Sequence, residues 1–362
     1  MKEVFLPPFA KAVSAGVATV MTAYGSVDGE PFTASKKTLK TILKDELGFD
    51  GFVVTDWDNV GRLVTDQFAA ADLNEASRYA VSAGNDMMMV TFDSYDGIMT
   101  EAEAGRISIE DIDEAVRRIL RIKFCAGLFE KPEKKSKQDI FGCEEHQQIN
   151  IEASKESLVL LENRNNVLPL SKDIKSIAVI GPNANDIVSQ YGDWTYFSHP
   201  KDSIDKTASE IHYTVLGGVK KLAEDYNISV EYTKGCDSLS DDTSGIEEAV
   251  SIAKKADAVI LVLGDNYSLH GETKDRANLF LSGKQQQLFD SIRKVSKKII
   301  TVLVSSKPLA IPTVAEQTDA LITMFNGGQY GGLSVAEVIF GEINPVGKLP
   351  ISFPYDSGQL PV

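Results

Sequence analysis

The segment from Gly51 to Trp57 (GFVVTDW) is an apolar run that ends in a carboxylate and an indole. The run Phe52–Val54 is typical of a strand buried on both faces, as in a parallel sheet. In α/β proteins the loops that leave the carboxyl ends of such strands carry the chemistry, and Asp56 follows such an end. An indole can stack on the apolar face of a sugar ring while a carboxylate reaches the reacting carbon. On these residues alone, the position of Asp56 fits either a sugar site or the N-cap of a helix.

The segments around this stretch favour the sugar site. Val20–Pro31 (VMTAYGSVDGEP), Leu39–Gly48 and then GFVVTDW follow one another in an order that resembles glycoside hydrolase family 3. This is the family of β-glucosidases and related exo-acting enzymes, and the resemblance extends from about Val4 to the last residue. It implies that Asp56, the aspartate of the T-D-W segment, is the catalytic nucleophile.

A second carboxyl group is expected, because retaining glycosidases use one carboxylate as nucleophile and another, about 5–5.5 Å away, as acid and then base. Glu272 lies in the loop Asn266–Arg276 (NYSLHGETKDR), which follows the predicted strand Ala258–Gly264. The loop resembles the acid/base loop of the family, in which a Glu precedes an Arg and a Leu-rich segment. A nearby carboxylate or a dry pocket would raise the pKa of Glu272 and keep it protonated. The alternative is a polar surface loop with a Glu–Arg pair.

Four further residues resemble family positions that contact the substrate. Trp57 resembles the aromatic wall of the aglycone side, with packing at the edge of the core as the alternative. Met21 and Tyr24 resemble positions near the nucleophile, where a phenol can hydrogen-bond a carboxylate and hold it ionised, although both also suit a barrel interior. Trp194 resembles a position that closes over the site from the second domain.

His270 is the rival of Glu272 for proton transfer. Family members that act on N-acetylglucosaminides use an Asp/His pair, but their histidine lies in a barrel loop and they often lack the second domain. Since this chain has the second domain, we expect His270 to line the site or to lie at the surface.

Composition limits the classes of partner. The 362 residues carry a net charge of −15, which argues against nucleic acid or an anionic membrane and is compatible with a neutral sugar. No apolar run approaches the roughly 20 residues that span a bilayer. Cys125, Cys143 and Cys236 are scattered and match no metal spacing, so free thiols are favoured over a disulfide.

The pattern of strands and helices predicts an α/β protein of two domains. Residues 1–128 contain three β/α units, with strands at Val17–Tyr24, Phe52–Thr55 and Asp86–Val90, and end in the amphipathic helix Ile109–Cys125. A complete TIM-like (β/α)8 barrel needs eight strands in roughly 250 residues. We therefore expect an incomplete barrel remnant, the last three β/α units, which carries the nucleophile.

Residues 129–145, which include the charged stretch EKPEKKSKQ, are predicted to be a linker. Residues 146–362 are predicted to form an α/β sandwich with a mostly parallel sheet that carries the acid/base loop. A helix at His146–Leu161 opens it, and Pro345–Pro354 is expected as a last edge segment because of its prolines. The other expected strands are Ser176–Gly181, Ser229–Thr233, Ala258–Gly264, Ile299–Ser305 and Ala320–Phe325.

The resemblance also implies groups that this chain does not contain. Family members with this organisation carry about five more barrel strands ahead of the matching segment, and these supply most of the groups that hold the sugar. We therefore expect a truncated or split chain, nearly inactive alone, that a missing N-terminal barrel half completes in trans. The first residues, Met1-Lys2-Glu3, are not typical of a signal peptide. The resemblance implies that a periplasmic or secreted location is common in the family.

The expected function is that of a retaining exo-acting β-glycosidase, with a β-glucosidase favoured. It would hydrolyse terminal non-reducing β-linked sugars from a glucoside or oligosaccharide, with no metal or organic cofactor. The alternative is a non-catalytic carbohydrate-binding or assembly module derived from such an enzyme.

Overall fold

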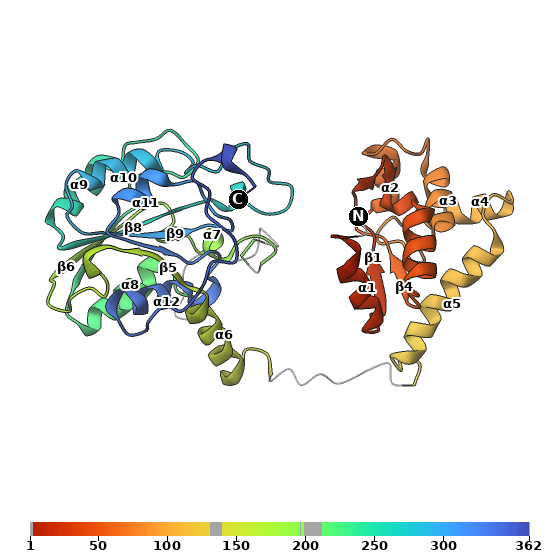
Figure 1. Ribbon diagram of the computed structural model, residues 1–362, viewed down its shortest axis with the longest axis horizontal. Helices are drawn as coiled ribbons and strands as arrows, with labels where there is room; N and C mark the ends of the chain where they lie inside the picture. Colours follow the sequence, from red (N-terminus) through yellow and green to blue (C-terminus); the bar gives the residue numbers. More distant parts are fainter. Residues whose placement is uncertain (1–2, 131–139, 196, 199–211, 362) are drawn as a thin grey trace. The chain divides into compact units, whose positions relative to one another are not determined.

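The chain forms two compact units, residues 1–136 (unit 1) and 137–362 (unit 2). The computed structural model shown in Figure 1 describes residues 3–130, 140–195, 197–198 and 212–361. Most of the predicted linker, 129–145, lies outside the described residues.

A short parallel sheet forms the centre of unit 1. Strand β1 (Thr19–Met21) pairs with β4 (Phe52–Val54), so that Met21 lies opposite Val54. Beyond β4, the described pairing consists of one isolated parallel bridge between Val54 and Met87. A separate antiparallel pair joins β2 (Ser26–Val27) to β3 (Glu30–Pro31).

The helical segments of unit 1 are α1 (Leu6–Ser14), the 3₁₀ turn η1 (Phe32–Ala34), the π-helix η2 (Lys37–Glu46), α2 (Asn59–Thr65), α3 (Leu73–Ala83), α4 (Ser94–Glu103) and α5 (Ile109–Cys125). The bounds of α5 are those predicted from its apolar periodicity. The helix begins at Ser108, whose hydroxyl accepts the Asp111 N–H, as an N-cap residue does. Its apolar stripe nevertheless has no buried residue within unit 1.

The predicted third strand of unit 1, Asp86–Val90, is reduced to the single bridge at Met87, because side chains take two of the hydrogen bonds that a longer strand ladder would use. The Asp86 carboxylate accepts the Val53 N–H at 2.7 Å, and the Thr55 hydroxyl accepts the Met89 N–H at 2.8 Å. Asp86 is paired in turn with Lys44, whose Nζ lies 2.8 Å from Oδ1, and both side chains are buried. Burial raises the pKa of the Asp86 carboxyl, although the Lys44 charge opposes this.

Unit 2 is built on a six-stranded sheet in the order β5-β10-β9-β8-β6-β7, which is parallel except for β5. Its strands are β5 (Val159–Asn163), β6 (Ser176–Ile180), β7 (Ser229–Thr233), β8 (Ala258–Gly264), β9 (Ile299–Val304) and β10 (Ala320–Thr323). Every residue of the central strands β8 and β9 is buried, as expected for a parallel sheet covered on both faces.

Helices cover both faces of this sheet, as Figure 1 shows, and one apolar cluster lies on each side. Helices α8 and α12 pack on one face, and α9, α10 and α11 pack on the other. The helical segments of unit 2 are α6 (Glu144–Ser157), the 3₁₀ turn η4 (Arg164–Asn166), α7 (Ile187–Tyr191), α8 (Val215–Asp225), α9 (Ile246–Lys255), the 3₁₀ turn η5 (Tyr267–Leu269), α10 (Gln285–Arg293), α11 (Pro312–Gln317), the 3₁₀ turn η6 (Gly328–Tyr330), α12 (Gly331–Phe340) and the 3₁₀ turn η7 (Ser357–Gln359).

Two predictions for unit 2 are wrong at the edge of its sheet. The predicted helix His146–Leu161 ends at Ser157, and the chain then forms β5, which pairs antiparallel with β10. The predicted edge segment Pro345–Pro354 forms no strand in the described structure. A short apolar run such as Leu158–Leu161 fits a helix and a strand equally well. Here pairing with β10 determines that the segment is a strand.

Candidate active site

In unit 1 the predicted residues gather at the carboxyl ends of the two parallel strands. Met21 ends β1, and Asp56 comes two residues after the end of β4. Because Met21 is in register with Val54, the two strand ends lie side by side. Asp56 is half-buried, whereas Met21 and Trp57 are 50% and 60% exposed. The exposure of Trp57 disagrees with an indole packed at the core edge and leaves its ring free to stack within this unit.

Tyr24 contacts the same turn through its phenol. Its hydroxyl donates a hydrogen bond to the Trp57 carbonyl at 2.7 Å, one residue beyond Asp56, and the guanidinium of Arg62 lies 4.6 Å from its ring centroid. The Asp56 carboxylate accepts the Trp57 N–H at 2.6 Å. The phenol therefore fixes the backbone that follows the carboxylate.

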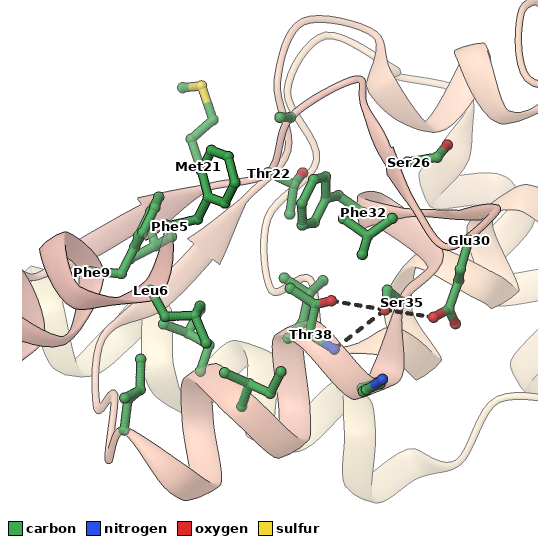
Figure 2. Close-up of a pocket in the computed structure, with 18 of the residues that line it drawn as sticks. Phe5, Leu6, Phe9, Met21, Thr22, Ser26, Glu30, Phe32, Ser35 and Thr38 are labelled. Carbon is green, nitrogen blue, oxygen red and sulfur yellow. Dashed lines mark hydrogen bonds between the residues drawn. The ribbon is translucent and has the colours of Figure 1, made fainter. Parts of the chain in front are cut away.

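A cavity of about 860 Å³ in unit 1 lies beside β1, and Asp56 is not among the residues that line it. Figure 2 shows its apolar wall, with Phe5 and Phe9 near Met21 and with Phe32 on the other side of Thr22. At its lower edge the Ser35 hydroxyl donates to Glu30 at 2.8 Å and accepts the Thr38 N–H. The mostly apolar lining suits packing against protein more than binding of a hydroxyl-rich sugar.

In unit 2 the structure brings Glu272 and Trp194 together from separate loops. The Trp194 indole N–H donates to the Glu272 carboxylate at 2.8 Å. Both side chains reach solvent within this unit, and Trp194 is 71% exposed. Within unit 2 alone, no dry pocket encloses Glu272, so the means of keeping it protonated that the sequence analysis offered stays a prediction. Among the described residues, the Glu272 carboxylate pairs with the Trp194 indole, and not with an arginine as the alternative interpretation of this loop expected.

The loop that carries Glu272 follows β8, and a buried carboxylate anchors it. Asp265, which has no exposed surface, accepts hydrogen bonds from Arg276 and Lys307, each at 2.5 Å. Arg276 also donates to the Phe280 carbonyl at 2.6 Å. Arg276, the arginine of the predicted acid/base loop, therefore links the end of that loop to the end of β8.

His270 is buried, at 3% exposed, which corrects the expectation of a lining or surface residue. Its ring lies edge-on to Tyr267 with the centroids 6.5 Å apart. Burial lowers the pKa of the imidazole, so it stays neutral at pH 7. A buried, neutral ring suits packing beneath the loop better than proton transfer to a substrate.

Sequence reasoning missed Asp193, Asp265 and Lys307. Asp265 had a usable signal, because it directly follows the buried strand β8, as Asp56 follows β4. Asp193 and Lys307 gave no such signal, since each acts on the Glu272 loop from a segment far away in the sequence.

Among the described residues, no group of His, Cys, Asp and Glu side chains is arranged to hold a metal ion. Within the same residues, no helix combines the length and the apolar character needed to cross a membrane.

Comparison with known proteins shows the family of the chain. Residues 1–122 match the glycosyl hydrolase family 3 N-terminal domain, and residues 158–362 match the C-terminal domain. The chain belongs to glycoside hydrolase family 3.

Two relatives illustrate the range within the family. A β-xylosidase of Formosa agariphila is 39% identical over 100% of this chain and 51% of its own length. A solved β-glucosidase involved in saponin metabolism from intestinal bacteria has 36% identity and a TM-score of 0.91, over 98% of this chain and 52% of its own.

A β-glucosidase of Listeria innocua, solved in complex with glucose, has 31% identity and a TM-score of 0.85 over 99% of this chain and 47% of its own. The chain thus spans about half the length of the relatives that it matches.

Proposed function

We propose that this chain carries both catalytic carboxyl groups of a retaining exo-β-glycosidase. Asp56 attacks the anomeric carbon of a terminal β-linked sugar, and Glu272 gives its proton to the departing oxygen. Water then cleaves the glycosyl-enzyme, and Glu272 accepts the proton of that water. β-Glucosides are the first substrates to test and β-xylosides the second, because relatives of both kinds match the chain.

One observation carries this proposal: each predicted carboxyl group follows a parallel strand and lies beside an indole. Asp56 follows β4 with Trp57 next to it, and Glu272 lies in the loop after β8 with Trp194 bonded to it. Aromatic planes beside carboxylates suit a sugar ring, whose C–H faces stack while its hydroxyl groups and anomeric carbon meet polar groups.

We also propose that unit 1 needs further barrel strands for activity, from the rest of a longer chain or in trans. Among the described strands, β1 has one partner, β4, and its other edge lies beside the apolar cavity. Phe5 and Met21 next to that cavity are 69% and 50% exposed. Apolar surface beside an unpaired strand edge favours pairing with more sheet. The same surface supports the second candidate, a non-catalytic assembly module.

The two candidates are separated by a chimeric enzyme in which this chain replaces the matched half of the Formosa agariphila β-xylosidase. Glu272→Ala should lower kcat/KM about 10²–10⁴-fold for sugars with poor leaving groups and much less for activated aryl glycosides. On activated aryl glycosides, azide should restore the turnover of Glu272→Ala, because it attacks the anomeric carbon of the glycosyl-enzyme without a general base, releases Asp56 and leaves a glycosyl azide. Asp275→Ala, an exposed residue of the same loop, is the matched control.

Equal activity of Glu272→Ala and Asp275→Ala on poor leaving groups would contradict the acid/base role. A folded chimera without any glycosidase activity, beside an active parent enzyme, would favour the assembly module.

A further inference from the structure

The carboxylate of Asp193 contacts the Glu272 loop at two points. Its Oδ2 accepts the Glu272 N–H at 2.9 Å, and its Oδ1 lies 3.7 Å from the Nζ of Lys274. The Asp193 side chain is only 11% exposed. Asp193 directly precedes Trp194, whose indole bonds the carboxylate of the same glutamate. Two adjacent residues therefore hold Glu272, one by its backbone and one by its side chain.

Gly271 makes this approach possible. A Cβ built on Gly271 would lie 2.2 Å from the Oδ2 of Asp193, far inside contact distance. Gly271 also has φ +117°, a conformation that side chains of L residues rarely adopt. Because Gly271 has no side chain, the Asp193 carboxylate has room to reach the Glu272 N–H.

The start of the loop is attached to the same part of unit 2. The Tyr267 N–H donates to the Ser189 hydroxyl at 3.0 Å, and Ser189 lies in α7, the helix that leads into Asp193. Asp186, at the N-cap of α7, accepts both the N–H and the hydroxyl of Ser189. Helix α7 and the turn after it thus form one support for the loop from Tyr267 to Lys274.

We propose that Asp193 is a positioning residue that holds Glu272 against Trp194. This inference rests on the proposed acid/base role of Glu272, but the contact itself is testable without any activity. Asp193 fixes the backbone of Glu272, and its charge attracts the Lys274 ammonium, which lies 3.7 Å away. The indole then sets the direction in which that carboxylate points.

The first test reads the Trp194 indole directly in the intact chain. The chain has two tryptophans, so its indole N–H signals in a ¹⁵N-correlated NMR spectrum are assigned with Trp57→Phe and Trp194→Phe. We expect the Trp194 N–H signal downfield, as for a bond to a carboxylate, and an upfield shift in Glu272→Ala. Asp193→Ala should cause the same upfield shift, Asp193→Asn a smaller one, and Asp275→Ala none.

The second test reads catalysis in the chimeric enzyme. A displacement of about 1 Å can cost on the order of 10²-fold in rate, so Asp193→Ala should lower kcat on poor leaving groups by about that factor. On activated aryl glycosides, whose leaving group departs without a proton, kcat/KM should change little, because it reports only the formation of the glycosyl-enzyme. Gly271→Ala should act through the same carboxylate, so its effect and that of Asp193→Ala should not add in the double variant.

The outcomes separate this proposal from the one on which it rests. A Trp194 signal that stays in place in Asp193→Ala overturns the positioning role, even if Glu272 proves to be the acid/base. A Trp194 signal that moves as expected supports the contact. If Glu272→Ala then keeps full activity on poor leaving groups, the proposed function fails and the contact remains a structural one.

Discussion

Every residue of β8 and β9 in unit 2 is buried, whereas the 17-residue helix α5 in unit 1 has no buried residue. Unit 2 covers both faces of a six-stranded sheet with helices, but the parallel sheet of unit 1 has two strands and one isolated bridge among the described residues. The apolar residues of α5, such as Val116 and Phe124, remain 49% and 57% exposed.

The difference indicates that the sheet that carries Glu272 is more stable than the sheet that carries Asp56. Burial of apolar surface contributes about 25 cal/mol per Å², so a fully covered sheet gives the loops that leave it a stable base. Glu272 extends from such a sheet and is held by α7 and Asp265. Asp56 extends from a small sheet, where side chains such as Asp86 and Thr55 replace strand pairing.

The largest expected effect concerns hydrogen exchange in the intact chain. Amides of β8 and β9 should exchange at least about 10³-fold more slowly than those of β1 and β4, equal to about 4 kcal/mol of extra opening free energy. Mass spectrometry of peptides after timed exchange measures this. Equal protection of the two sheets would contradict the comparison and remove the need for added strands.

The buried pair Lys44–Asp86 offers a way to weaken unit 1 alone. Lys44→Ala leaves a buried carboxylate without its partner and should lower the unfolding free energy by about 3–5 kcal/mol. Urea unfolding of the variant beside Lys37→Ala, an exposed lysine of the same helical segment, measures the loss.

The loss in Lys44→Ala should depend on pH. Burial raises the pKa of Asp86 above its value in the unfolded chain, so the folded state binds a proton more tightly. The stabilisation from that proton is complete below the unfolded pKa and is lost as pH rises through the folded pKa. The variant should therefore recover part of its stability as the pH is lowered, and a constant loss across acidic pH would argue against a buried carboxylate.

Core packing should distinguish the units with a single substitution in each. Leu261→Ala in β8 removes a side chain with no exposed surface and should cost about 2–5 kcal/mol. Leu120→Ala in α5, where the side chain is 39% exposed, should change unit 1 by about 0.5 kcal/mol or less. Thermal unfolding of both variants tests the contrast, and a large effect of Leu120→Ala would mean that α5 is already covered.

The smallest effect concerns the thiols. Burial raises the pKa of Cys236 to about 11, whereas Cys125 is exposed, and all three cysteines are free. Iodoacetamide at pH 8 should therefore modify Cys125 rapidly and leave Cys236 unmodified until the protein is denatured. Rapid native labelling of Cys236 would show that unit 2 opens locally at that position.

Much of unit 2 could be predicted from the sequence, because its strands are continuous apolar runs between clear helices. The predicted bounds of β7 and β8 are those observed. The failures arise where distant groups decide the local structure. Pairing with β10 turns Val159–Asn163 into a strand, and in unit 1 the Asp86 carboxylate takes a hydrogen bond that a longer third strand would use.

The residues of the candidate site show the same contrast between local sequence signals and contacts from distant segments. Asp56 and Glu272 were predicted from their positions after apolar strands together with the resemblance to the family, and both signals lie in the local sequence. Asp193 was not found, because its contact with the Glu272 N–H joins segments 79 residues apart. The roles of Asp56, Trp57, Tyr24, Met21 and Trp194 in binding and catalysis stay predictions until substrate is present.

The most direct test of the central claim is to trap the glycosyl-enzyme with a 2-fluoro-2-deoxy-β-glucoside and locate the label by mass spectrometry. The chain is treated alone and within the chimeric enzyme, with Asp56→Asn as the control. We predict a label on Asp56 in the chimeric enzyme, no label in Asp56→Asn, and little or none in the chain alone. A label on another carboxylate, or none in an active chimeric enzyme, would contradict the assignment of Asp56 as the nucleophile.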